Sequence, residues 1–149
     1  HHLVAAERVM NSTKNNRYFE DCHDGDDVNI EDRGYGNFTC NGWEFEPRDE
    51  VKGDVARMLF YMAVRYEGDS VFDDGFDLVL ANDPDDDKSL KLPIYGDIDD
   101  LLRWHMEDPV SLWELDRNEV IYSYQGNRNP FIEHPELVEL IWGSPEDYE

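Results

Sequence analysis

The first nineteen residues, HHLVAAERVMNSTKNNRYF, are the stretch that decides the fold. His1 to Val4 can form a short strand, and Ala5 to Met10 can form a short helix. Residues 11–16, NSTKNN, are of the types that cap helices and form tight turns. The order predicts a strand, a helix and then a polar turn that carries Asn11.

The next strongest signal is a helix over Val51–Tyr66, which is apolar on nearly every side. Its two apolar faces consist of Val55, Met58, Leu59 and Met62, and of Ala56, Phe60, Ala63 and Val64. A helix with this pattern is buried, so we expect it to be the central core helix.

Further helices are predicted nearer the C-terminus. Asp97 can cap a helix over Ile98–Glu107, and a last helix is expected over Pro135–Trp142. Asp108 and Pro109 can start a helix that runs to about residue 124 and stops at Gly126. This helix should bury Val110, Trp113, Val120, Ile121 and Tyr124.

Residues 20–50 are rich in glycine and acids, which predicts an irregular stretch with a short hairpin around Tyr35–Trp43. The whole chain has 149 residues, 40% hydrophobic and 13% aromatic, which suffices for one core and argues against disorder. No apolar run approaches the roughly 20 residues of a membrane span. We expect one monomeric α+β domain over residues 1–149, predominantly helical, with no membrane partner.

The formal net charge is −23, but the acids are unevenly distributed. Residues 1–19 carry three cations against one acid, and so do residues 51–66. By contrast, residues 20–50 and 67–100 have net charges of −9 and −10. An acidic shell suits a halophilic habitat, where screening shortens electrostatic repulsion to a few Å. The alternative is a protein that avoids nucleic acid.

The chain has two cysteines, Cys22 and Cys40. In an acidic, loop-rich segment they fit an exported protein with one disulfide, which would stabilise the fold by about 3 kcal/mol. Two free thiols remain an alternative. A zinc site that adds His23 is a weaker one, because the paired spacing of structural zinc ligands is missing.

Several motifs follow the first stretch: KGDVARMLFYM at 52–62, LRWH at 102–105, DPVS at 108–111 and QGNRNPF at 125–131. Together with HHL and VMNSTKNN, this order resembles the endonuclease I family, secreted bacterial nucleases of the ββα-metal (His-Me finger) class. The resemblance extends from His1 to Trp142, and QGNRNPF is its most specific piece. Lys14 stands where the family usually has arginine.

The resemblance implies a metal-dependent endonuclease that hydrolyses phosphodiester bonds in DNA or RNA without sequence specificity. It implies Asn11 as the protein ligand of Mg²⁺ or another divalent cation such as Ca²⁺ or Mn²⁺. A neutral amide oxygen holds a hard cation without cancelling its charge. From the residues alone, a helix cap also explains Asn11.

The family's general base is a histidine in an EH-x-x-P segment upstream of HHL, and the acid before it is a second metal ligand. This chain begins at His1, so we expect a fragment without that base, comprising the C-terminal part of the ββα-metal fold. His1 and His2 are weaker catalytic candidates. Side chains alternate along a strand, so only one of the two can face the site.

Four cations are predicted to contact phosphate: Lys14, Arg17, Arg57 and Arg128. Arg57 can instead be a paired structural charge, and Arg128 can tie its loop to the core. Glu114 and Arg117 are expected to form a buried ion pair with each other.

The function predicted from the sequence is therefore a secreted or periplasmic nuclease with nucleic acid as its substrate. The alternative is an acidic, non-catalytic binding module, such as a nucleic-acid mimic or a calcium-stabilised surface domain.

Overall fold

A computed structural model describes residues 1–6, 8–22, 36–40, 44–66, 78–82 and 94–148. The fold combines six α-helices with a small sheet of the order β2-β3-β1-β5-β4 in the described residues. The α+β class, with helices predominating, is confirmed. Among the described residues, no helix is both long and apolar enough to cross a bilayer.

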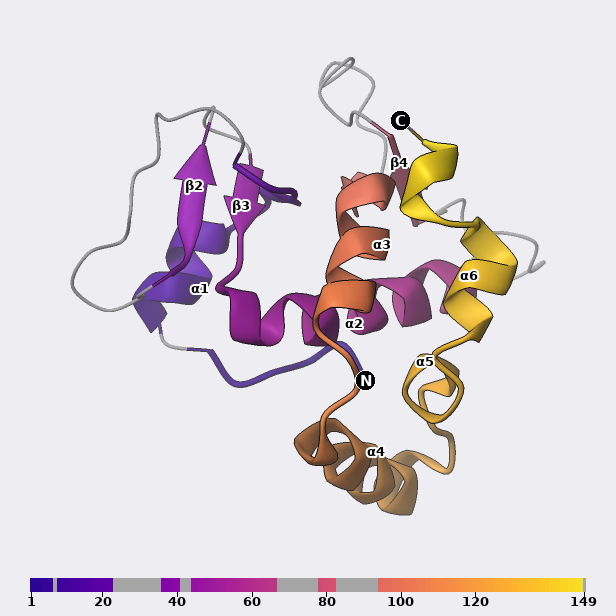
Figure 1. Ribbon diagram of the computed structural model, residues 1–149. Helices are drawn as coiled ribbons and strands as arrows, with labels where there is room; N and C mark the ends of the chain where they lie inside the picture. Colours follow the sequence, from indigo (N-terminus) through magenta and orange to yellow (C-terminus); the bar gives the residue numbers. More distant parts are fainter. Residues whose placement is uncertain (7, 23–35, 41–43, 67–77, 83–93, 149) are drawn as a thin grey trace.

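The central helix is α2, Lys52–Arg65, and it agrees with the helix predicted over Val51–Tyr66. It lies between the strands β2 and β3 on one side of the molecule and α5 and α6 on the other (Figure 1). Ala56 and Phe60 are fully buried, as expected for a helix that is apolar nearly all round. Burying a side chain such as Phe60 contributes about 2–3 kcal/mol.

The second helix of the core is α3, Ile98–Glu107, which crosses α2. Asp97 caps it as predicted, because its carboxylate accepts hydrogen bonds from the amides of Asp99 and Asp100. The buried core cluster comprises Ala56, Leu59, Phe60, Ile98, Leu101, Leu102, Trp104, Phe131 and Val138.

The sheet is short-stranded and mixed. The strands are β1 (Tyr18–Phe19), β2 (Phe38–Cys40), β3 (Glu44–Glu46), β4 (Val79–Ala81) and β5 (Ile94–Asp97). β2 and β3 pair antiparallel, so a hairpin is present as predicted, but it lies further along the chain than Tyr35–Trp43. Residues 41–43, between its strands, lie outside the described part. β1 runs parallel to both β3 and β5, and β4 runs parallel to β5.

The first nineteen residues depart from the prediction. His1–Val4 is not a strand, and the first helix, α1, is Arg8–Lys14 rather than Ala5–Met10. Arg117 donates hydrogen bonds to the carbonyl oxygens of His1 and Leu3, at 3.2 and 2.6 Å. In a sheet, a neighbouring strand would donate to these oxygens. The hydroxyl of Thr13 donates to the carbonyl of Val9, so this polar residue is satisfied inside the helix.

The helix α4, Leu112–Gln125, ends at Gly126 as predicted, but its predicted start at Asp108 and Pro109 and its predicted buried face are wrong. Ser111 caps it through a capping box with Glu114, whereas Asp108 accepts from the amide of Gly53. Trp113, Val120 and Tyr124 are 53%, 59% and 87% exposed, and its buried residues are Glu114 and Asn118. The inward face is polar because it packs on polar partners in α2 and after Gly126.

The C-terminal segment contains α5 (Pro130–Glu133), α6 (Leu137–Trp142) and a 3₁₀ turn at Pro145–Asp147. Another 3₁₀ turn, Asp49–Val51, directly precedes α2. Gly126 ends α4 at φ 76°, the left-handed conformation expected of a helix-terminating glycine. The short helix α5, capped by the Asn129 side chain, was not predicted.

Candidate nucleic-acid interface

The helix α1 presents Asn11 to solvent. Asn11 and Ser12 are exposed, and the side chain of Asn11 has no hydrogen-bond partner among the described residues. A shallow groove along this helix is lined by Arg8, Val9, Ser12 and Thr13. The predicted metal ligand is therefore at an accessible position within a helix, three residues before its end, rather than in a turn.

Two more cations, Lys14 and Arg17, lie at the end of α1 and in the turn after it. The Lys14 ammonium donates to the carbonyl of Arg17 at 2.6 Å and lies 4.4 Å from the ring centre of Phe19. Burial, and then the charge of Arg17, lowers the pKa of Lys14 to about 8. Arg17 donates to the carbonyl of Thr13, and its Nε is buried without a partner. Neither cation is neutralised by a carboxylate of the described residues.

The described cations fall into two sets. Five contact carboxylates within 4.0 Å: Arg48, Lys52, Arg57, Arg103 and Arg128. Within the described residues, the other five have no such contact: Arg8, Lys14, Arg17, Arg65 and Arg117. Three of these come from α1 and the turn after it, one from the end of α2 and one from α4.

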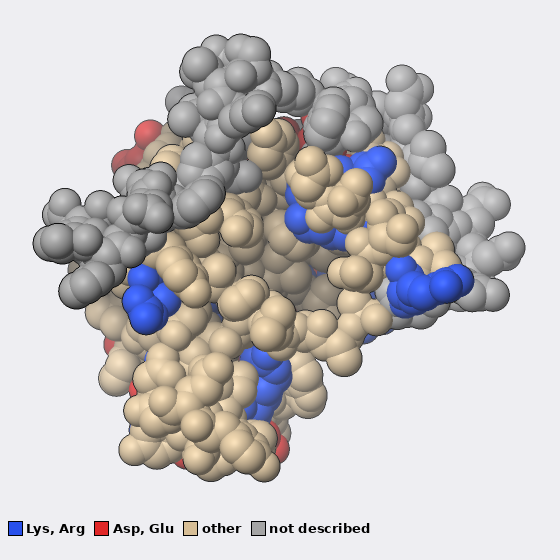
Figure 2. All heavy atoms as spheres, turned by 180° about the vertical axis from the view of Figure 1, so that it is seen from behind, with Lys and Arg blue, Asp and Glu red and all other residues tan. Residues whose placement is uncertain are grey.

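The reverse side of the molecule shows how the charges are distributed (Figure 2). Basic side chains stand around a central hollow there, whereas acidic atoms appear only near the outline. By comparison with Figure 1, α1 borders this hollow on one side and α4 lies below it. This side, called the basic face below, can therefore receive a polyanion despite the net charge of −23.

Arg57, predicted to contact phosphate, is fully buried. Its Nε and Nη2 donate to the two oxygens of Glu114 at 2.7 and 2.8 Å, and its Nη1 donates to the carbonyl of Asp108 at 2.8 Å. The expected pair of Glu114 with Arg117 is wrong, since Glu114 pairs with Arg57. The structure thus gives Arg57 the structural role that the sequence left open.

Asp54 completes this buried cluster. It lies 3.5 Å from Nη2 of Arg57 and beside Glu114. Burial, followed by the charge of Glu114, raises the pKa of Asp54 to about 7. Gly53 is required here, because a Cβ at this position would lie 2.0 Å from the carbonyl oxygen of Asp108.

The QGNRNPF loop binds the same cluster from its other side. The side-chain amide of the buried Asn129 donates to the backbone carbonyl of Arg57 at 3.0 Å. The backbone amide of Asn129 donates to the side-chain oxygen of Asn118 at 2.9 Å. Arg128 pairs with Glu119 and Glu133 and stacks 3.6 Å over Tyr122. The loop therefore ties α4 and α5 to α2, and its arginine is already occupied by carboxylates.

His1 and His2 differ in their surroundings. The His1 side chain is buried, its Nε2 is 3.0 Å from the carbonyl oxygen of Asn127, and its ring lies 4.6 Å from that of Tyr61. His2 is exposed, and partial desolvation of its ring lowers its pKa. His1 therefore has the contacts of a structural residue.

The only carboxylate group among the described residues with a metal-like spacing is Asp97, Asp99 and Asp100, whose oxygens lie within 4.8 Å of one another. Asp97 caps α3, and Asp99 and Asp100 both pair with Arg103. Burial raises the pKa of Asp100 to about 6. These carboxylates already have structural partners.

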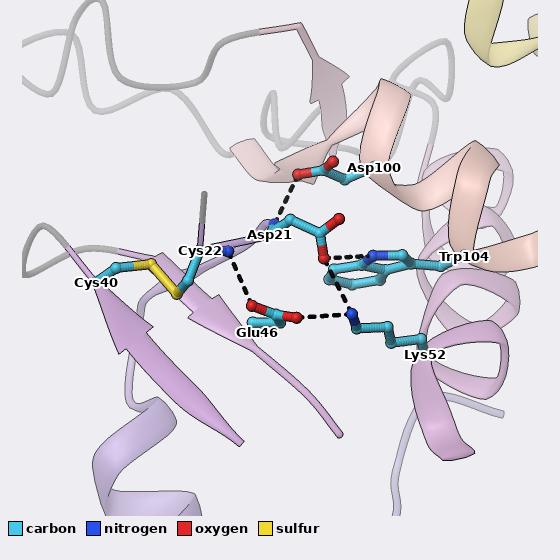
Figure 3. Close-up of a disulfide and its surroundings, with 7 residues drawn as sticks. All are labelled: Asp21, Cys22, Cys40, Glu46, Lys52, Asp100 and Trp104. Carbon is cyan, nitrogen blue, oxygen red and sulfur yellow. Dashed lines mark hydrogen bonds and ion pairs between the residues drawn. A yellow bond between two sulfur atoms is a disulfide. The ribbon is translucent and has the colours of Figure 1, made fainter. Parts of the chain in front are cut away.

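Cys22 and Cys40 form a disulfide, as predicted, and it joins the end of β1 to β2 (Figure 3). Next to it, the amide of Cys22 donates to Glu46, which in turn binds Lys52 at 2.7 Å. Asp21 continues this network: it accepts from the indole of Trp104 at 2.8 Å and pairs with Lys52 at 3.2 Å. The disulfide and this network fix the sheet to the start of α2 and to α3.

Sequence reasoning did not single out Arg8, Arg65 and Arg117 as cations that contact no carboxylate in the described residues. The excess of cations over acids in residues 1–19 and 51–66 was a usable signal. It could not separate Arg57 from Arg65, because pairing with Glu114 depends on the tertiary fold.

Comparison with known proteins agrees with the motifs. The family model for Endonuclease I matches residues 1–136. The extracellular ribonuclease of Bacillus amyloliquefaciens is 47% identical over 143 residues, which is 95% of this chain and 45% of the relative. The extracellular ribonuclease of Bacillus subtilis (strain 168) is also 47% identical, over 95% of this chain and 46% of its own length. The chain spans less than half the length of these curated relatives, and it belongs to the endonuclease I family.

Proposed function

We propose that the full-length protein is an extracellular nuclease that hydrolyses phosphodiester bonds in RNA, with DNA as a second substrate. The curated relatives carry the name extracellular ribonuclease, which supports RNA as the first choice. The observation that carries the proposal is the basic face around α1. Cations without carboxylate partners are available to phosphate, and paired ones are not.

The metal is proposed to be a hard divalent cation, Mg²⁺ first, bound through the side-chain oxygen of Asn11. This exposed amide fits such an ion, because Mg²⁺ keeps several waters and needs few protein ligands. When bound, the cation would neutralise charge on the phosphate in the transition state. Arg8 and Arg17, on the same helix and the turn after it, would hold the adjacent phosphates in register.

The acidic remainder of the surface is proposed to be an adaptation to high salt. At low ionic strength, the charge of −23 slows the approach of a polyanion, whereas molar salt shortens the repulsion to about 3 Å. The basic face then acts only at close range, after contact.

The test is cleavage of fluorescently labelled RNA and DNA by the full-length protein, with Mg²⁺ or a chelator, at low and at molar salt. We expect cleavage only with the metal, and a loss of at least about 100-fold for Asn11→Ala. The matched control is Asn16→Ala, another exposed asparagine, which lies beyond α1.

Thermal melts should show Asn11→Ala within about 0.5 kcal/mol of the wild type, since the side chain has no partner to lose. A folded full-length protein that cleaves neither substrate at any salt concentration would favour the non-catalytic binding module. Full activity of Asn11→Ala would remove Asn11 from the metal site.

A further inference from the structure

The helix α4 buries polar residues and exposes apolar ones along one flank. Glu114 and Asn118 are each 2% exposed, whereas Trp113, Val120 and Tyr124 are more than half exposed. Spacings of seven and four residues place these three on one side of the helix. They form, with Arg117 between them, the feature called the α4 stripe below.

Arg117 keeps an uncompensated charge. It donates to the carbonyl oxygens of His1 and Leu3, which are neutral, and its guanidinium lies 5.7 Å from the ring centre of Trp113. It contacts no carboxylate within the part of the chain that the structure describes. The α4 stripe thus consists of two exposed aromatic rings, one aliphatic residue and a cation that contacts no carboxylate of the described residues.

The stripe continues the basic face. His1 to Ala6 runs from the side of α4 to α1, and Arg117 fixes the first residues of this segment (Figure 1). In Figure 2 the lower lobe, where α4 lies, is largely uncharged and borders the hollow with its basic rim. A chain of phosphates bound along α1 and the hollow would therefore bring its bases toward α4.

We propose that the α4 stripe binds single-stranded nucleic acid by stacking bases on Trp113 and Tyr124, while Arg117 contacts the adjacent phosphate. This inference rests on the proposed function, whose substrate it describes as unpaired strands. Aromatic rings and arginine beside a basic groove are how proteins hold single strands, whose bases are free to stack. A duplex keeps its bases in its own stack.

A second copy of the chain fits the stripe less well. The three exposed side chains offer on the order of 400 Å². Stable dimers bury about 800 Å² on each partner. In a two-fold dimer centred on the stripe, the positively charged Arg117 side chains of the two copies would also lie close together.

The binding test uses the 149-residue chain with a chelator, so that no metal-dependent cleavage occurs, and measures fluorescence anisotropy of three probes. These are a labelled single strand of about 12 nucleotides, an abasic strand of the same length, and a duplex. We expect the single strand to bind best. Trp113→Ala should weaken its binding about tenfold and leave the abasic strand unchanged.

Two further variants separate stacking from general hydrophobic contact. Trp113→Phe keeps a ring and should retain most of the affinity, whereas Trp113→Leu keeps the apolar surface and should lose it. Tyr122→Ala is the matched control, because it removes an aromatic ring from the opposite side of α4. Melting curves should confirm that each variant is folded.

The inference is overturned if Trp113→Leu binds the single strand as tightly as the wild type does. It is also overturned if Trp113→Ala weakens binding of the abasic strand as much as binding of the intact strand. A dimer in sedimentation that Trp113→Ala dissociates would overturn it too. If the full-length protein cleaves RNA while these variants bind normally, the inference fails and the proposed function stands. If no probe binds and no substrate is cleaved, both fail.

Discussion

The buried cluster around Arg57 and the exposed residues of α1 contain the same kinds of side chain in opposite surroundings. Arg57 is fully buried and held by both oxygens of Glu114, and Asn129 is fully buried between Arg57 and Asn118. Arg8 and Asn11 are exposed and have no partners among the described residues. Charge and motif therefore do not separate a buried, paired residue from an accessible one, whereas the tertiary fold does.

The sharpest way to break this comparison is Arg57→Met, set against Arg65→Met eight residues along the same helix. Removing Arg57 leaves the carboxylate of Glu114 buried and unpaired, which should reduce the free energy of unfolding by about 3–5 kcal/mol. Arg65 is exposed, so its replacement should change stability by less than about 0.5 kcal/mol. Urea denaturation measures both.

Replacing the pair together, as Arg57→Met with Glu114→Leu, should recover much of the loss, because neither member of the pair is then left buried without the other. If Arg57→Met alone denatures at the urea concentration of the wild type, the cluster is not structural and Arg57 returns as a functional candidate.

A second effect, which depends on pH, is expected from the proton that the Asp54 carboxyl group holds. The pKa of Asp54 rises from 3.8 when unfolded to about 7 in the fold, so the folded state binds this proton more tightly. Its contribution to stability is therefore complete below pH 3.8 and is lost as the pH rises through about 7.

Asp54→Asn has no such proton, so relative to the wild type it should gain stability between about pH 4 and pH 8. The readout is the difference between the two unfolding free energies, in which other titrating groups cancel. A difference that does not vary with pH would show that the pKa of Asp54 is the same in the folded and unfolded states.

The smallest expected effect is on the salt dependence of binding, and it comes from Arg65, which contacts no carboxylate of the described residues. Arg65→Gln should reduce the slope of log affinity for single-stranded RNA against log salt by about 0.7, the value for one phosphate contact. Arg48→Gln is the paired control, because Arg48 already contacts Glu50 at 3.8 Å, and its slope should not change. Equal slopes for Arg65→Gln and the wild type would place Arg65 outside the phosphate path.

The elements that the sequence predicted well are those that local rules govern. The buried helix α2, the Asp97 cap of α3 and the left-handed Gly126 all follow from short-range spacing or backbone preference. The family motifs likewise identified Asn11 as the candidate ligand, and the structure leaves its side chain accessible.

The errors arise where a distant partner decides. The inner face of α4 is polar because Glu114 meets Arg57, which is 57 residues away in the chain. Local hydrophobicity predicted the opposite face, with Trp113 and Tyr124 inside. The predicted strand at His1–Val4 failed for a similar reason, because Arg117 binds its carbonyl oxygens.

The Cys22–Cys40 disulfide makes the stability of the chain depend on whether its surroundings are oxidising or reducing. It links residues 18 positions apart, and a bond of this kind contributes about 3 kcal/mol, roughly a hundredfold in the ratio of folded to unfolded molecules. Cytosolic glutathione keeps such thiols reduced. The folded chain is therefore less stable in a reducing cytosol than in oxidising surroundings, which fits the extracellular location in the names of its relatives.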